Sequence, residues 1–151
     1  MSDRTKVMLE LHPSAADANV VISGLRAFNV EFIGDPAEEP VHVFLRDSAG
    51  AIVGGLIGHI RWRWLYVSKL WVAATHRGQG HGAALIIAAE EHARSRDCLG
   101  VHLDTFEFQA RPFYEKLGYE LFGTLDDYPP GYRQHHLAKR FGSVPEGNPT
   151  R

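Results

Sequence analysis

A strand, a glycine-rich loop and a helix follow one another from Leu70 to Arg94, and this run constrains the fold most. The loop Arg77-Gly78-Gln79-Gly80-His81-Gly82 separates an apolar strand from a helix rich in alanine and aliphatic residues. Glycines at alternate positions let the backbone turn tightly and approach a ligand closely. The first N–H groups of the helix are unpaired and lie at the positive end of its dipole. These features predict an anion site of the kind that holds a phosphate or pyrophosphate.

Two common phosphate-binding motifs fit this loop less well. A Walker loop needs a lysine and a Ser/Thr after its second glycine, and no such lysine is present. Residues 78–83 match the dinucleotide-binding pattern G-x-G-x-x-G/A, and Asp97 lies about 20 residues further on. However, residues 73–77 separate the strand from the first glycine, and the preceding segments have the pattern of antiparallel hairpins. This context disfavours a dinucleotide site.

Two motifs together resemble those of the GNAT family of N-acetyltransferases. Arg77-x-x-Gly80-x-Gly82 is similar to the family's loop for the pyrophosphate of acetyl-CoA, and LDTFEFQARPFYEKLGYELFG (103–123) resembles its later strand–helix motif. The resemblance covers about residues 6–140 and implies a mixed α/β, single-domain acetyltransferase fold. In that fold the central sheet is mostly antiparallel, two parallel strands splay apart, and helices flank the sheet. The implied activity is acetyl-CoA-dependent N-acetylation, by direct attack, of a primary amine of a small molecule or peptide.

The resemblance also implies roles for individual residues. Tyr114 takes the place of the general acid, since a phenol with a pKa of about 10 can protonate a thiolate whose conjugate pKa is about 8.5. The alternative is a tyrosine that only packs in the core. The implied cofactor-binding residues are Leu70, Trp71, Val72, Arg77, Gly78, Gln79, Gly80, His81, Gly82, Gln109 and Phe113.

A general base is harder to identify. The strand expected at residues 63–73 carries no carboxylate. Glu107, Glu31 and Asp127 are candidates, and direct transfer to an amine delivered neutral is a further option. This gap leaves open an alternative function, a non-catalytic acyl-CoA-binding module of the same fold.

The acceptor site is expected at the far end of the splayed strands. Loop 29–39, strand residues 62–66 and loop 126–132 would line it, because aromatic residues gather in these segments. The nine histidines do not follow any common metal-binding spacing, so no metal site is predicted.

Composition fits an ordinary globular protein. The 151 residues are 44% apolar and 23% charged, with a net charge of −2, which predicts one domain over residues 1–141 and no nucleic-acid partner. Residues 142–151 are polar and predict a flexible tail. The single Cys98 and the lack of a long apolar run indicate a cytoplasmic protein without a membrane partner; a homodimer stays open.

Hydrophobic periodicity predicts ten elements. A short strand at 6–12 precedes a helix at 14–29 that begins at the N-cap Ser14. Three strands at 41–47, 51–60 and 63–73 form an antiparallel meander, and a strand at 99–105 runs parallel to the third. The remaining elements are helices at about 80–95 and between Pro112 and Gly118, and a closing hairpin of strands 119–125 and 132–140.

Overall fold

The computed structural model describes residues 4–142, and the chain divides into two compact units, Met1–Pro36 and Ala37–Arg151. Each unit is described by itself. The first contains α1, Ala15–Ile33. Its N-cap is Ser14, whose Oγ accepts a hydrogen bond of 3.1 Å from the N–H of Asp17, as the sequence predicts. Gly34, with φ +75°, donates its N–H to Val30 and ends the helix four residues beyond the expected boundary.

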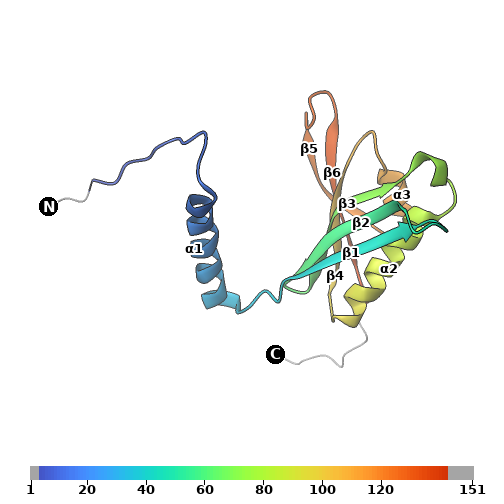
Figure 1. Cartoon of the computed structure of the whole chain (residues 1–151), viewed down its shortest axis with the longest axis horizontal. Coiled ribbons are helices and arrows are strands. Elements are labelled where there is room, and N and C mark those ends of the chain that lie inside the picture. Colours follow the sequence, from blue (N-terminus) through green and yellow to red (C-terminus); the bar gives the residue numbers. More distant parts are fainter. Residues whose placement is uncertain (1–3, 143–151) are drawn as a thin grey trace. The chain divides into compact units, whose positions relative to one another are not determined.

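The described part of the second unit forms a six-stranded sheet in the order β1-β2-β3-β4-β6-β5 (Figure 1). Branched and aromatic residues are frequent in the strands, and glycine or proline occurs in the β1–β2 and β5–β6 turns. The β2–β3 turn is made by Trp62 and Arg63, both with positive φ. The elements are β1 Glu39–Arg46, β2 Ile52–Arg61, β3 Trp64–Val72, the 3-10 turn η1 Ala74–His76, α2 His81–Ser95, β4 Gly100–Phe106, α3 Arg111–Lys116, β5 Glu120–Asp126 and β6 Arg133–Arg140.

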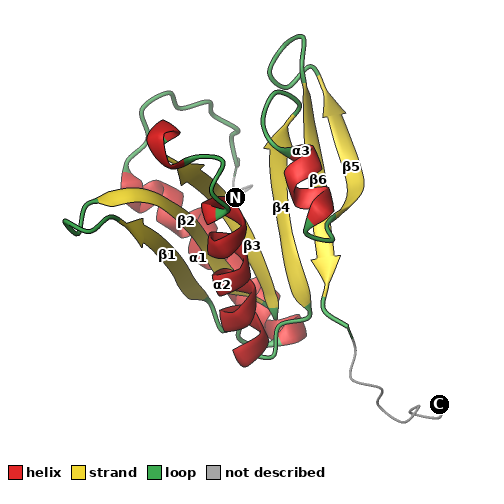
Figure 2. Ribbon diagram, turned by 90° about the vertical axis from the view of Figure 1, so that its right-hand side faces the viewer, coloured by secondary structure: helices red, strands yellow, loops and turns green. Residues whose placement is uncertain are grey.

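Strand pairing confirms the predicted fold class. β1, β2 and β3 form an antiparallel meander, and β4, β6 and β5 also pair antiparallel. β3 and β4 are parallel, but their pairing ends at Val67 and Leu103 although both strands continue. Figure 2 shows the two strands side by side at one end and diverging toward the other. The sheet therefore contains the splayed parallel pair that the resemblance implied.

The core lies between one face of the sheet and the helices α2 and α3, which lie on the same side (Figure 2). α2 contributes Leu85, Ile86, Ala89 and Ala93, all at most 4% exposed. Strand residues that point to this face are buried too, because side chains alternate between the two faces along a strand. This face is called the core face below, and the opposite one the second face.

Three sequence predictions need comment. The strand predicted at 6–12 is wrong, because the described residues there adopt no strand and a strand needs a partner to hydrogen-bond. The predicted tail at 142–151 lies outside the described residues except for Gly142. A single domain over 1–141 stays a prediction.

Within residues 4–142, no helix combines the length and the apolar character that crossing a membrane requires.

Candidate active site

The glycine loop joins the end of β3 to the start of α2. Arg77 lies one turn after β3 and donates from Nε to the Val72 carbonyl at 2.8 Å, so its side chain fastens the loop to the strand end. Gly78 and Gly80 have φ of +72° and +80°, in the left-handed region that favours glycine. A Cβ at either position would meet open space. Backbone conformation, rather than crowding, is therefore what requires these two glycines.

The start of α2 is left without a side-chain cap. Gly80 is the N-cap residue, and its carbonyl accepts the first helical hydrogen bond from Ala84 at 3.1 Å. The N–H groups of His81, Gly82 and Ala83 have no helical partner, by the geometry of any α-helix. An anion seated here would be held by these donors and by the helix dipole.

Gly82 has a different role from the other two glycines. A Cβ on Gly82 would lie 3.2 Å from Cζ of Phe113, tighter than ordinary contact. The first turn of α2 therefore packs directly on the ring of Phe113 in α3. This contact joins the loop to the helix that carries Tyr114.

A cleft of about 720 Å³ lies where β3 and β4 diverge. It is called the strand cleft below. It brings together six of the residues that the sequence singles out, from both motifs: Leu70, Trp71, Val72, Arg77, Gln109 and Tyr114. The other lining residues are Ser68, Lys69, Asp104, Thr105, Phe106, Phe108 and Ala110.

Tyr114 borders this cleft from α3. The residue is 6% exposed, and its ring packs against Phe113 and Tyr119 with centroids 5.0 and 5.8 Å apart. Burial, and secondarily the charge of Asp104, raise the pKa of Tyr114 to about 12. The phenol is thus a protonated donor at neutral pH, at the edge of a cleft that reaches Arg77 of the loop.

Gln109 has a structural contact that the motif does not reveal. Its Oε1 accepts hydrogen bonds from the N–H of Phe106 at 2.9 Å and from the Thr105 hydroxyl at 3.2 Å. The side chain therefore closes the turn after β4 while it also lines the strand cleft.

Asp104 is the charged residue of the cleft that sequence reasoning missed. It follows Leu103, the last residue of β4 that pairs with β3, and its carboxylate accepts hydrogen bonds from Tyr66 and Gln134. A signal was present in the sequence, since Asp104 is a charged residue within a strand whose other residues read as buried.

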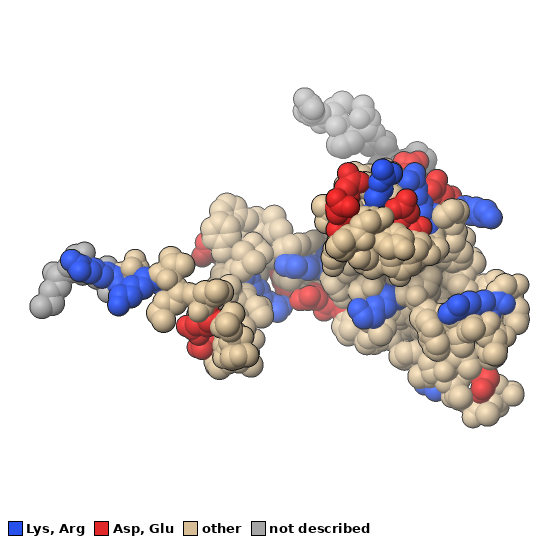
Figure 3. Space-filling view, turned by 90° about the horizontal axis from the view of Figure 1, so that it is seen from above, with Lys and Arg blue, Asp and Glu red and all other residues tan. Residues whose placement is uncertain are grey.

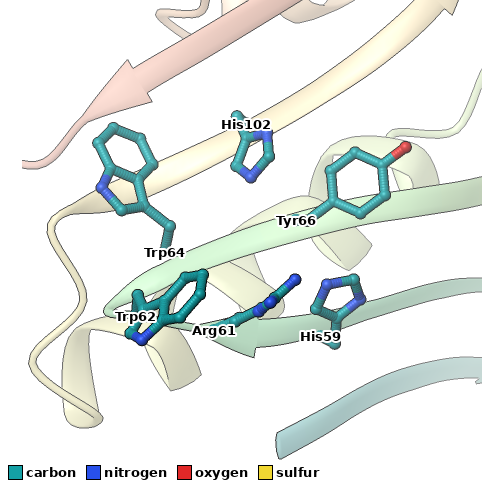
Figure 4. A pocket seen from close by; sticks show the side chains of 6 residues that line it. All are labelled: His59, Arg61, Trp62, Trp64, Tyr66 and His102. Carbon is teal, nitrogen blue, oxygen red and sulfur yellow. The ribbon is translucent and has the colours of Figure 1, made fainter. Parts of the chain in front are cut away.

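A second pocket, of about 410 Å³, lies on the second face of the sheet (Figure 4). Aromatic rings line this pocket. The ring centroid of Tyr66 is 5.0 Å from that of His102 and 5.5 Å from that of His59. Burial, followed by the charge of His59, lowers the pKa of His102. The lining residues are His59, Arg61, Trp62, Trp64, Tyr66 and His102.

Two of the three segments expected to line the acceptor site contribute to different pockets of the second unit. Strand residues 62–66 contribute to the pocket of Figure 4, whereas Asp127, Gly131 and Tyr132 line a separate one with Glu107. The segment 29–39 is expected to be a loop, but residues 29–33 belong to α1. The segment crosses the boundary between the two units, and its place in the acceptor site stays a prediction. No cluster of three metal-ligating side chains occurs within residues 4–142.

Comparisons with known proteins agree on one family. The model of the acetyltransferase (GNAT) family matches residues 9–119. A blasticidin-S acetyltransferase of Streptomyces morookaense is 47% identical over 91 residues, which cover 60% of this chain and 67% of the relative. An acetyltransferase of Agrobacterium fabrum is 36% identical over 117 residues, 78% of this chain and 85% of the relative.

A crystal structure of an acetyltransferase from Bacillus cereus has the same fold. It superimposes with a TM-score of 0.82 at 28% identity, covering 89% of this chain and 98% of the other. The family match spans both the glycine loop and Tyr114. The chain therefore belongs to the GNAT acetyltransferase family and is an N-acetyltransferase that uses acetyl-CoA as its acetyl donor.

Proposed function

We propose that this enzyme acetylates a primary amine of a small polar molecule, with the pyrophosphate of acetyl-CoA on the glycine loop and the thioester in the strand cleft. The observation that carries the proposal is the cleft itself, which extends from Arg77 to the buried Tyr114. The amine attacks the thioester carbon, the carbonyl oxygen becomes an oxyanion, and the C–S bond then breaks.

Tyr114 is the proposed general acid. When the C–S bond breaks, its electron pair goes to sulfur, and the Tyr114 hydroxyl donates a proton to it. The pKa of about 12 keeps the phenol protonated at neutral pH, so the proton is present when the C–S bond breaks. This role favours the enzyme over the non-catalytic binding module.

The N–H groups of the glycine loop and of the first turn of α2 are the proposed contacts to pyrophosphate. Backbone N–H of β3 residues Leu70 to Val72 would serve the thioester carbonyl, because these residues line the cleft beside Tyr114. The other predicted cofactor residues, among them Gln79 of the loop and Phe113 of α3, do not line the strand cleft. Their contact with acetyl-CoA is assigned as part of the same proposal.

A small acceptor is favoured over a peptide by the relatives. One is named a blasticidin-S acetyltransferase, and a solved nourseothricin acetyltransferase is 27% identical with a TM-score of 0.60, over 72% of this chain. A peptide acceptor, a homodimer and a cytoplasmic location stay predictions.

The test measures release of free thiol from acetyl-CoA in the presence of single acceptors. Blasticidin S, nourseothricin, simple diamines and short peptides with free N-termini form the panel. We expect turnover with at least one small polar amine and a mass gain of one acetyl group on it. Turnover with peptides alone would contradict the proposed acceptor class, and the absence of turnover with every acceptor would contradict the proposed function.

A further inference from the structure

Asp104 stands at the base of the strand cleft. The parallel ladder ends with the pair Val67 and Leu103, so Asp104 is the first residue of β4 beyond it. Three charged side chains line the cleft among the described residues, and Lys69 and Arg77 are both cations. Asp104 is therefore the carboxylate that a substrate amine in this cleft would meet.

Two neutral donors hold the Asp104 carboxylate in place. The Tyr66 hydroxyl donates to Oδ1 at 2.6 Å, and Nε2 of Gln134 donates to Oδ2 at 3.0 Å. Tyr66 comes from β3 and Gln134 from β6, the two strands that neighbour β4. Each carboxylate oxygen has a second lone pair, so both can still accept a hydrogen bond from a ligand.

Asp104 and Tyr114 approach the cleft from opposite faces of the sheet. The neighbours Leu103 and Thr105 are buried on the core face, so alternation places Asp104 toward the second face. Tyr114 comes from α3 on the core face. Both side chains line the strand cleft, and the charge of Asp104 contributes to the raised pKa of Tyr114.

Among the described residues, no second acidic side chain lines the strand cleft beside Asp104. Tyr66, His102, His136 and Tyr114 face it from β3, β4, β6 and α3, and Lys69 and Arg77 line the same cleft. Figure 3 shows Lys and Arg side chains among Asp and Glu on the face that it presents, rather than one broad acidic field.

Of the other three candidate carboxylates, Glu31 lies on α1 of the first unit and stays a prediction, and two lie in the second unit. Glu107 accepts a hydrogen bond from the N–H of Arg133 at 3.1 Å and so holds the start of β6. Asp127 accepts from the N–H of Gly131 at 3.4 Å within the β5–β6 turn. Both line a pocket that does not include Tyr114.

We infer that Asp104 is the catalytic carboxylate on the acceptor side, which binds the substrate amine and takes its proton as the new C–N bond forms. The inference rests on the proposed function. The nitrogen lone pair forms the C–N bond and the C–S pair leaves with sulfur. One proton passes from nitrogen to an Asp104 oxygen, another from Tyr114 to the thiolate, and solvent returns both groups to their starting state.

Tyr66 is a positioning residue in this scheme. Its ring lines the pocket of Figure 4, and its hydroxyl is directed away from Trp62 and Trp64 there. The bond to Asp104 and burial raise the pKa of Tyr66 to about 12, so the hydroxyl stays a donor throughout the working pH range. A hydrogen bond to the ionised carboxylate stabilises that form.

Asp104→Asn tests the inference, with Glu107→Gln as the matched control. We expect Asp104→Asn to keep the wild-type rise in Tm with acetyl-CoA, and to lose about 10²- to 10⁴-fold in kcat/KM for the best amine of the panel. Glu107→Gln is expected to retain the wild-type rate. A wild-type rate in Asp104→Asn, or the same loss in Glu107→Gln, would overturn the inference.

Tyr66→Phe supplies a second measurement should Asp104→Asn not fold. Removing the hydroxyl makes the ionised Asp104 carboxylate less stable. We therefore expect the acid limb of the pH profile of kcat/KM, measured with the same acceptor, to move to higher pH. An unchanged limb would contradict the role of Asp104. These results differ from those expected if the proposed function is wrong. In that case the wild-type enzyme itself would release no thiol with any amine.

Discussion

Glu90 of α2 and Lys139 of β6 form an ion pair beneath the sheet, with Nζ and Oε2 2.8 Å apart. The side chain of Glu90 is 6% exposed and that of Lys139 is 24% exposed. The Tyr119 hydroxyl also donates to Glu90, at 3.4 Å. A charged residue thus lies in a helix face that otherwise packs apolar side chains, and one cation neutralises it.

Removing that cation is expected to destabilise the fold. Lys139→Met keeps the apolar stem but leaves the Glu90 carboxylate buried without a charge partner, which costs about 3 kcal/mol of unfolding free energy. Urea unfolding monitored by circular dichroism measures the loss. Arg133→Gln, which breaks an exposed pair with Asp126, is the control and should change stability by less than about 1 kcal/mol. Equal losses of unfolding free energy in the two variants would show that the burial of Glu90 does not determine the effect of removing its partner.

Gly80→Asp is expected to abolish acetyl-CoA binding. The substitution places a side chain on a residue with φ +80° and adds a negative charge at the N-terminus of α2. Wild-type enzyme should gain about 2.7 kcal/mol at a ligand concentration 100-fold above Kd, seen as a higher Tm, and the variant should show no such rise. Gly50→Asp is the control: it introduces similar backbone strain, since Gly50 has φ +85° in the β1–β2 turn. This variant should keep the rise in Tm with acetyl-CoA. Retained stabilisation in Gly80→Asp would contradict the loop as the pyrophosphate site.

Tyr114→Phe is expected to lower turnover by about 10²- to 10⁴-fold while acetyl-CoA still raises Tm, because only the proton donor is removed. Single-turnover kinetics with a good acceptor measures the chemical step. Tyr119→Phe removes a buried hydroxyl that contacts Glu90 and does not line the strand cleft, so it should turn over near the wild-type rate. Full activity in Tyr114→Phe would make Tyr114 a packing residue.

Stability should decrease at alkaline pH. The pKa of Tyr66 is raised to about 12 by its bond to Asp104 and by burial, and that of Tyr114 to about 12 by burial and the Asp104 charge. In the unfolded chain both titrate near pH 10, so above about pH 10 the folded state holds protons that the unfolded state has lost. The stabilisation is complete below about pH 10 and disappears as pH rises through about 12.

Urea unfolding at about pH 9 and about pH 11 measures this decrease. The double variant Tyr66→Phe/Tyr114→Phe should show a shallower decrease than wild type. The same slope in both proteins would indicate that other groups control alkaline unfolding.

Much of the second unit could be predicted from its sequence, because local signals there agree with tertiary contacts. Alternating strands with short turns led to the β1–β2–β3 meander, and the helix between β3 and β4 required those strands to be parallel. The glycine motif and the Phe113-Tyr114 pair located two borders of the strand cleft. By contrast, residues 6–12 show an apolar pattern without a hydrogen-bonding partner, and periodicity alone does not reveal partners.

Asp104 was missed because its role depends on residues far away in the sequence. The carboxylates that the sequence suggests as bases are expected in loops or after a strand, whereas Asp104 lies within β4. Its donor Tyr66 is 38 residues before it and Gln134 is 30 after it. Only the sheet order β3-β4-β6 brings them together.

The contact between Gly82 and Phe113 packs the glycine loop directly against α3, the helix that carries Tyr114. Phe113 lies against the first turn of α2 and against the ring of Tyr114. A shift of the loop by a few tenths of an ångström would press on Phe113 and displace the phenol beside it. In the proposed placement of acetyl-CoA, the sites for its diphosphate and its sulfur are therefore held at a fixed separation. A thioester carrier with a shorter or longer arm is then expected to place its sulfur out of reach of the Tyr114 proton.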